Sequence, residues 1–197
     1  AVRYFLFCFL SVTMVTPLLL DDYSDASEDH SLISRLTQEP IAMKWKEFKA
    51  PYGDFQVEFP TRPTEGETTL GKPGSALPVT EFCTDKKQEV TYSVSYTTLP
   101  HKWVKWGAGP VLKGALKMMA KHFKQTIVSK VSQKHGKLPA LHYLLTSGSH
   151  EKHGKLILVG YRLYRVEITY PKEKREEIQT ARHTFLESFR STNSIAK

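Results

Sequence analysis

Apolar and polar residues alternate through the central part of this chain, and that alternation constrains the fold more than any other feature of the sequence. Val90, Tyr92, Val94 and Tyr96 are separated by single threonine or serine residues. A period of two is typical of a β-strand with one buried face. A second strand-like segment, 78–84, precedes it across a short polar turn, so we expect the two to form an antiparallel β-hairpin.

Further strand-like segments lie on both sides of the predicted hairpin. Two short strands are expected at 45–48 and 55–59, and the segment 61–78, with three prolines and three glycines, is expected to be a loop with at most one edge strand. Four later strands are predicted at 127–134, 140–146, 155–159 and 162–169, with turns at 135–136, 147–154 and 160–161. Most neighbouring strands are expected to pair antiparallel.

Two segments change to a helical period of three and four residues. The apolar positions are Leu112, Ala115, Leu116, Met119 and Phe123 in a helix predicted over 110–124, and Ile178, Ala181, Phe185 and Phe189 in a second helix after Pro171. Glu173, Glu176 and Glu177 are expected in the first turn of the second helix, where the helix dipole favours acidic residues. A helix with one apolar stripe must pack on another layer, so the chain is predicted to be α+β, a mostly antiparallel β-sheet packed with two amphipathic helices.

The N-terminal residues have the pattern of a targeting segment. Residues 4–20 are mostly apolar, follow Arg3 and precede two aspartates, as in the apolar region of an export signal. If the chain is cleaved after Ser24-Asp25-Ala26, the segment is a signal peptide; if it is not cleaved, the segment is an N-terminal membrane anchor. We therefore expect an exported protein that is periplasmic, secreted or membrane-anchored. The predicted organisation is a signal peptide or anchor at 1–26, a linker at 27–44, a single α+β domain at 45–191 and a disordered tail at 192–197.

Three motifs carry a resemblance to a known family. They are Gly53-Asp54-Phe55-Gln56-Val57-Glu58-Phe59-Pro60, Tyr161-Arg162-Leu163-Tyr164 and Phe185-Leu186-Glu187-Ser188-Phe189. Together they resemble a bacterial exported family of unknown function, over residues 45–191. The resemblance implies a fold similar to that of PsbP, the extrinsic photosystem protein, in which an antiparallel sheet lies between helices. It also implies a binding or assembly module and supplies no catalytic residues, because the shared positions are structural.

The chain is strongly basic, and its charges are unevenly distributed. The formal net charge is +8, and it would rise to +10 without residues 1–26, which contain one arginine and three aspartates. From Val90 to His150 there is no aspartate or glutamate, whereas nine lysines and five histidines occur. A basic exported domain is expected to bind an anionic surface or an acidic protein of the envelope, and its N-terminus offers a route to membrane association. Nucleic acid belongs to a different compartment and is not expected as a partner.

Four lysines in this acid-free interval are spaced to share one face of the predicted helix. They are Lys113, Lys117, Lys121 and Lys124. Like charges at such spacings repel by about 0.2–0.5 kcal/mol each, and an anionic partner would offset this repulsion. We therefore interpret the four lysines as a candidate docking site. The alternative is an ordinary solvated helix face, since lysine is a good helix former.

Two tryptophans stand just before the predicted helix. Trp103 and Trp106 are interleaved with Lys102 and Lys105. Indole rings beside lysines suit a membrane interface, a sugar or a stacked base, so we add both tryptophans to the candidate docking site. The alternative is that the two rings pack over the edge of the core.

The sequence predicts no catalytic residue, metal site or cofactor. It has no Gly-x-Ser-x-Gly motif and no phosphate-binding loop. His150 and His153 are expected in a flexible turn and fall short of the three or four ligands that zinc requires. Cys83, the one cysteine of the predicted domain, is expected to be buried, the alternative being a disulfide between two chains.

Two classes of function remain open at this point. The basic surface favours a non-enzymatic, envelope-associated binding or assembly module. The alternative is a small hydrolase or a ligand-binding protein with a site in a cleft of the sheet. Such a site needs polar groups that converge in space, and their convergence depends on strand pairing that the sequence does not display.

Overall fold

The computed structural model describes residues 43–52, 54–71 and 74–192, which belong to one compact unit spanning 42–197. The predicted signal peptide or anchor and nearly all of the predicted linker lie outside the described residues, and of the predicted tail only Thr192 is described. None of the helices within the described ranges is long and apolar enough to cross a membrane.

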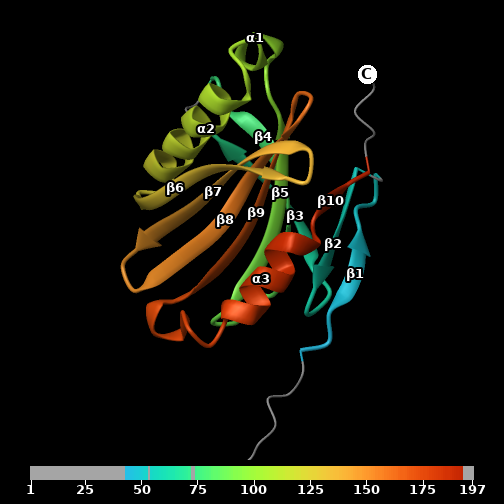
Figure 1. The fold of residues 1–197 in the computed structure, drawn as a ribbon, viewed down its shortest axis with the longest axis vertical. Coiled ribbons are helices and arrows are strands. Elements are labelled where there is room, and N and C mark those ends of the chain that lie inside the picture. Colours follow the sequence, from blue (N-terminus) through green and yellow to red (C-terminus); the bar gives the residue numbers. More distant parts are fainter. Residues whose placement is uncertain (1–42, 53, 72–73, 193–197) are drawn as a thin grey trace, which may run out of the picture. The chain divides into compact units, whose positions relative to one another are not determined.

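Seven antiparallel strands form the main sheet of this unit (Figure 1). Their spatial order is β3 (Thr64–Leu70), β4 (Leu77–Cys83), β5 (Thr91–Thr98), β9 (Arg162–Pro171), β8 (His150–Val159), β7 (Leu138–Ser147) and β6 (Thr126–His135). The predicted hairpin is confirmed as β4 and β5, in which Phe82 pairs with Val94. β3 is an edge strand, as expected for the segment 61–78, and β6 forms the other edge.

A second, three-stranded sheet joins segments from the beginning and the end of the unit. β1 (Lys46–Lys49) and β2 (Phe55–Phe59) are the two short strands expected from the sequence, and β10 (Arg190–Ser191) pairs with the free side of β2. The backbone N–H of Thr192 donates to the carbonyl of Asp54 at 3.1 Å and extends this pairing. The sequence does not predict β10, because a strand of two residues is too short to show a period.

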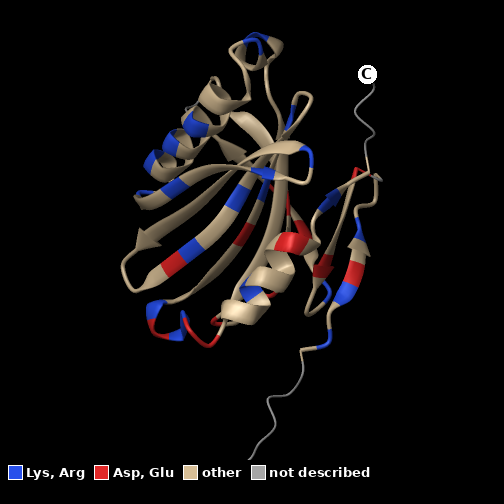
Figure 2. Cartoon of the chain, viewed as in Figure 1, with Lys and Arg blue, Asp and Glu red and all other residues tan. Residues whose placement is uncertain are grey.

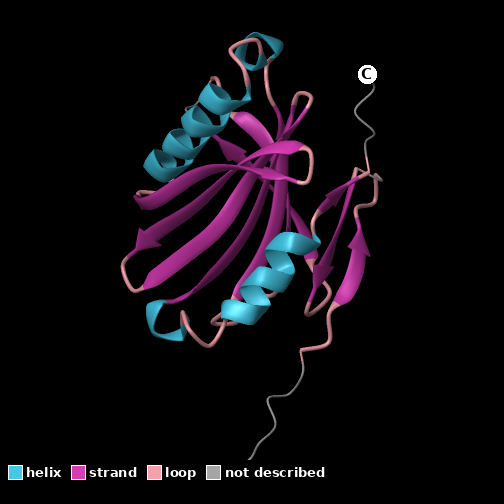
Figure 3. Ribbon diagram, viewed as in Figure 1, coloured by secondary structure: helices cyan, strands magenta, loops and turns pink. Residues whose placement is uncertain are grey.

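The helix α2 (Ala108–His122) covers one face of the main sheet, as its apolar period predicts. Its buried side chains include Leu112, Leu116 and Met119. They pack against alternate residues of β7, β8 and β9, which are Leu141, Tyr143, Leu145, Leu156, Leu158 and Leu163. A short helix that the sequence does not predict, α1 (His101–Val104), precedes α2 (Figure 3).

The opposite face of the main sheet is covered by α3 (Gln179–Ser188) and by the small sheet. Phe185 in α3, Phe189 just after it and Phe55 of β2 pack against the other set of alternate residues, which includes Tyr164 and Val166. The main sheet therefore lies between the two amphipathic helices. The predicted α+β class, with a mostly antiparallel sheet, is confirmed.

The expected turn at 147–154 is wrong. β8 begins at His150, and residues 150–154 pair with β7. The chain reverses over Gly148 and Ser149 alone, with Gly148 at φ +58°, a conformation that glycine adopts without steric cost. His150 and His153 are therefore strand residues rather than residues of a flexible loop.

The expected position of three acidic residues is also wrong. The segment that holds Glu173, Glu176 and Glu177 forms a short 3₁₀ helix, η2 (Lys172–Lys174), and turns, and α3 begins only at Gln179. Two charge pairs connect this segment to its neighbours: Arg175 pairs with Glu151 of β8, and Lys174 pairs with Glu89 in the turn between β4 and β5. The acids therefore precede the helix instead of lying in its first turn.

A half-buried histidine beneath α3 links the helix to the main sheet. The Nδ1 atom of His153 in β8 lies 2.5 Å from the hydroxyl of Tyr170 in β9 and 3.4 Å from a guanidinium nitrogen of Arg182 in α3. Burial lowers the pKa of His153 to about 4, and the charge of Arg182 contributes to this shift. In the unfolded chain the ring titrates near its ordinary pKa of about 6.5. Between these two pKa values, the His153 ring is therefore neutral in the folded protein and protonated in the unfolded chain.

We expect this difference to make the free energy of unfolding fall as the pH falls from about 6.5 to about 4. The substitution His153→Gln removes the titration and keeps an acceptor for Tyr170. The parent should lose about 1 to 2 kcal/mol more of its free energy of unfolding over this range than the variant does. This figure allows for the solvent around the partly exposed ring, which weakens the effect. Denaturant unfolding at about pH 7.5 and about pH 4.5 measures the difference. Equal losses in the two proteins would contradict the expectation.

Candidate functional site

Three of the four lysines of the predicted docking site lie on the exposed side of α2. Lys113, Lys117 and Lys121 recur at four-residue intervals and are all exposed, whereas Leu112 and Leu116 beside them face the sheet. Side chains four residues apart are neighbours on a helix surface. The structure therefore brings these three lysines together on one face.

The fourth lysine lies beyond the helix, so the expected helix end at 124 is wrong. The last turn of α2 closes with a Schellman motif, in which the N–H of Gln125 donates to Ala120 at 2.8 Å and the N–H of Lys124 donates to Lys121 at 3.3 Å. Lys124 adopts the left-handed conformation, with φ +52°, that this motif requires. Its side chain is exposed but extends from the loop after the helix. We use the term lysine ridge for Lys113, Lys117, Lys121 and Lys124.

The chain segment that carries the lysine ridge contains no acidic residue. The interval without aspartate or glutamate, from Val90 to His150, includes α1, α2, β6 and β7. Figure 2 shows basic residues, all of them lysines, and no acidic residue along α1, α2 and β6, whereas acidic residues occur on β1, β2 and α3. Within residues 90–150, all of which are described, no lysine forms an ion pair with a carboxylate.

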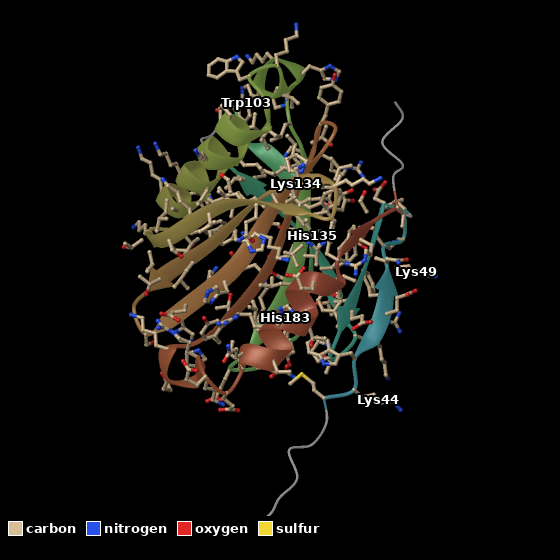
Figure 4. All side chains as sticks on the ribbon, in the orientation of Figure 1. Lys44, Lys49, Trp103, Lys134, His135 and His183 are labelled. Atoms are coloured by element: carbon tan, nitrogen blue, oxygen red, sulfur yellow. The ribbon has the colours of Figure 1, made fainter. Side chains whose placement is uncertain are left out.

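The two tryptophans lie at the N-terminal end of α2. Trp103 belongs to α1 (Figure 4), and 37% of its surface is exposed. Trp106, in the turn between α1 and α2, is 78% exposed. Packing over the core therefore buries part of the Trp103 side chain but very little of the Trp106 side chain.

An apolar pocket of about 440 Å³ lies between α1 and α2. Its walls include Trp103, Trp106, Val111, Gly114 and Met118, and Lys102 is the one charged residue among the described residues that line it. Val111, Gly114 and Met118 form a third side of α2, next to the side that packs on the sheet, and the half-buried Val111 and Met118 also pack against the edge of that core. These three residues follow the helical spacing of three and four. Because Gly114 has no apolar side chain, the sequence does not show them as a continuous apolar side.

Gly114 is an unusual residue for the interior of a helix. Glycine destabilises such a position by about 0.5–1 kcal/mol relative to alanine. A Cβ atom at Gly114 would have no other atom within 4 Å, and the backbone has no positive φ there. Neither close packing nor backbone conformation requires this glycine. Its effect is to leave one wall of the pocket without a side chain.

A second, polar recess of about 380 Å³ lies on the same face of the sheet, beyond the C-terminal end of α2. Its charged lining residues come from strands far apart in sequence and include Glu81, Lys152, Arg165 and Glu167. The ring of Phe123, just after α2, stands beside Lys152 and Arg165, at 5.7 and 5.9 Å from its centroid. Polar groups from separate strands converge in this recess, as the alternative function with a site in a cleft of the sheet requires.

The charged groups of the recess are paired with one another. Arg165 donates to Glu81 at 2.9 Å and to the hydroxyl of Ser95 at 3.0 Å. Glu167, only 3% exposed, accepts a hydrogen bond of 2.7 Å from the hydroxyl of Tyr143 and lies 3.4 Å from the ammonium of Lys152. These groups form a preorganised polar wall in which each charge has a partner.

This pairing determines what chemistry the recess can perform. Burial raises the pKa of Glu167, but Arg165 and Lys152 outweigh burial and hold the pKa below its ordinary value, so the carboxylate stays ionised. Burial raises the pKa of the Cys83 thiol, and Glu81 adds to the shift. A protonated buried thiol is a poor nucleophile. The recess is therefore suited to holding a polar ligand and lacks an activated nucleophile. Cys83 is buried, as expected.

The histidines that the sequence places close together do not meet. His150 and His153 are three residues apart on β8, so their side chains point to opposite faces of the sheet. In residues 43–52, 54–71 and 74–192, no three histidine, cysteine, aspartate or glutamate side chains gather closely enough to hold a metal ion.

Gly154 makes the polar wall possible. A Cβ atom at this position would lie 2.4 Å from Cζ and the hydroxyl oxygen of Tyr143 and 2.9 Å from the carbonyl oxygen of Val166. The tyrosine therefore reaches Glu167 only because residue 154 has no side chain. Sequence reasoning missed Tyr143, Glu167 and Gly154, since an isolated glycine in a strand signals a close approach but does not name the partner.

We expect Gly154→Ala to destabilise the fold by about 2–3 kcal/mol, because Tyr143 must leave its position and its hydrogen bond to Glu167. In a Tyr143→Leu background, which removes the obstructing ring, the same substitution should cost clearly less. Denaturant unfolding of the parent, the two single variants and the double variant measures the coupling. Strictly additive effects would contradict this role of Gly154.

The fold of this chain resembles folds seen in solved structures. The solution structure of cyanobacterial PsbP (CyanoP) from Synechocystis sp. PCC 6803 matches with a TM-score of 0.53 and 12% identity, covering 76% of this chain and 93% of that one. The crystal structure of the Saccharomyces cerevisiae Ran-binding protein Mog1p matches with a TM-score of 0.48 and 10% identity, covering 77% and 97%. The sequence itself matches no protein-family model and no curated protein. The likeness to CyanoP confirms the expected PsbP-like fold.

Proposed function

We propose that this chain is a non-catalytic, exported binding module of the bacterial envelope that docks on an anionic lipid surface through the lysine ridge, Trp103 and Trp106. The observation that carries this function is the exposed, acid-free face of α1 and α2, on which no lysine has a carboxylate partner. An acidic protein of the envelope is the competing partner, and the experiment below separates the two.

The charge on this face is large enough to drive reversible docking. A lysine near an anionic membrane contributes about 1 kcal/mol, so the four lysines of the ridge contribute about 4 kcal/mol, or two to three orders of magnitude in affinity. This attraction decays within about 10 Å at moderate salt and should therefore be lost at high salt.

The tryptophans favour a lipid surface over a purely acidic protein. Trp106 exposes 78% of its surface beside Lys105, which is an unfavourable arrangement for an isolated domain in water. Indole rings concentrate at membrane interfaces because they combine a large apolar area with one N–H donor. Lysine and tryptophan together therefore match both the charge and the polarity gradient of a membrane surface.

A second candidate function is the binding of a small polar ligand in the recess that contains Glu81 and Glu167. The buried polar wall supports it, because Arg165 and Lys152 are held in fixed positions by charged partners. The absence of an activated nucleophile among the described lining residues favours ligand binding over hydrolysis. Turnover in a broad substrate screen would overturn the non-catalytic assignment.

We expect the chain from Ser27 onward, which contains the whole compact unit, to sediment with anionic phospholipid vesicles at low salt and not with zwitterionic vesicles. Replacing the four lysines of the ridge by glutamine should weaken this binding about 100-fold or more. Trp106→Ala should weaken vesicle binding less than the four lysine replacements do. The loss of affinity caused by Trp106→Ala should not depend on the salt concentration.

A matched control replaces four exposed lysines outside the acid-free interval, Lys44, Lys46, Lys49 and Lys172, by glutamine, which changes the net charge by the same amount. This variant should bind vesicles nearly as the parent does. Equal losses in both variants, or unchanged binding of the ridge variant, would contradict docking through α2. Binding to an acidic polypeptide but not to anionic vesicles would replace the lipid surface by an acidic protein.

A further inference from the structure

The packing of the domain explains only part of the apolar pocket between α1 and α2, because Val111 and Met118 also pack against the edge of the core whereas Trp106 does not. α2 already buries Leu112, Leu116 and Met119 against the sheet. Its third side, with Val111 and Met118, faces Trp103 and Trp106 across a space of about 440 Å³. Pockets that bind small ligands usually measure about 300–1,000 Å³ and have mostly apolar walls. The pocket has the size and the lining of a ligand site.

Gly114 supplies an independent reason to regard the pocket as a binding site. The glycine weakens the middle of α2, and neither a close contact nor a positive φ requires it. A larger apolar residue at this position would extend into the space beside Trp103 and Trp106 without meeting another atom at its Cβ. Such a residue would stabilise the helix and fill the pocket. The glycine therefore maintains an opening that stability alone would close.

The charges around the pocket indicate which end groups its ligand carries. Lys102 is the only charged residue among the described lining residues, and Lys105 precedes the lining residue Trp106 in the sequence. No carboxylate occurs anywhere between residues 90 and 150 to neutralise them. An apolar space with a cationic rim is complementary to a molecule with an apolar chain and a negatively charged head.

We propose that this pocket binds a free single-chain amphipathic anion, such as a medium-chain carboxylate, with its chain against Val111, Gly114 and Met118 between the two tryptophans and its head beside Lys102. A pocket of this volume accommodates one chain of about ten to twelve carbons and is too small for both chains of a membrane phospholipid. The head group binds beside Lys102 and not at the lysine ridge, so this site differs from the proposed docking surface in its charged residues, although it shares Trp103 and Trp106 with that surface.

The test uses the full chain and dodecanoate below its micelle concentration, with binding measured by isothermal titration calorimetry and by tryptophan fluorescence. Gly114→Leu should weaken dodecanoate binding at least about tenfold, because the new side chain occupies the space of the ligand, and should raise the melting temperature. Lys102→Gln should weaken dodecanoate binding but leave the binding of the uncharged dodecanol unchanged. Butyrate, which has the charge without the chain, should not bind.

Gly109→Leu is the matched control, because Gly109 is also an α2 glycine with no atom within 4 Å of its Cβ position, but it lines a separate recess beside β6. This variant should bind dodecanoate as the parent does. Unchanged binding by Gly114→Leu, or equal losses in both leucine variants, would overturn the pocket assignment. The assignment would also be overturned if the parent does not bind dodecanoate and Gly114→Leu changes the oligomeric state. The pocket would then hold a second copy of the chain.

Two further measurements keep this site separate from surface docking. Gly114→Leu should still sediment with anionic vesicles, and the glutamine variant of the lysine ridge should still bind dodecanoate. If the ridge variant loses dodecanoate binding and Gly114→Leu keeps it, the ligand adsorbs to the lysines, and the pocket assignment fails while docking stands. If vesicle binding fails in the parent and dodecanoate binding follows the expected pattern, docking fails and the pocket stands.

Discussion

Aromatic packing between the two sheets is the interaction on which the rest of this structure depends. Phe55 of β2 is fully buried, and its ring contacts aromatic rings from both sheets and from the end of α3. Those neighbours are Phe48, Phe82, Tyr96, Tyr164 and Phe189. Burying an aromatic side chain removes a large apolar area from water, so this cluster holds the beginning and the end of the unit against the middle of the main sheet.

The two faces of the main sheet therefore have different roles. The face beneath α3 and the small sheet is closed by aromatic side chains. On the other face, α2 has 15 residues and extends about 22 Å, whereas the ten-residue strands of β7, β8 and β9 extend about 33 Å. The helix leaves part of this face uncovered, and the polar recess lies there. The apolar pocket lies at the opposite end of the same helix, so one short helix determines the position of both candidate ligand sites.

Periodicity in the sequence was sufficient to predict the elements that have one continuous buried face. The strands β5, β7 and β9 and the inner side of α2 follow from alternation or from helical spacing. Prediction failed where short-range chemistry decides the structure. Lys124 takes a left-handed conformation to end α2, and Glu173, Glu176 and Glu177 lie in the short 3₁₀ helix and turns where Arg175 pairs with Glu151.

The candidate sites divide in the same way. The lysine ridge was predictable because its members are near one another in sequence and share a helical period. Glu81, Tyr143, Lys152 and Glu167 belong to four strands, and only the observed order and register bring them together. A shift of one residue in any of those strands would move its side chain to the other face. Spatial convergence of this kind is a property of the register, which short sequence patterns do not encode.

The contact between Gly154 and Tyr143 also constrains how this protein can change over evolutionary time. Gly154 cannot be replaced freely while Tyr143 stays, because the ring occupies the volume of the missing side chain. Lineages that lose the tyrosine release the glycine, and lineages that keep the tyrosine must keep the glycine. The two positions should therefore vary together among relatives, and a relative that has alanine at the first should be found without tyrosine at the second.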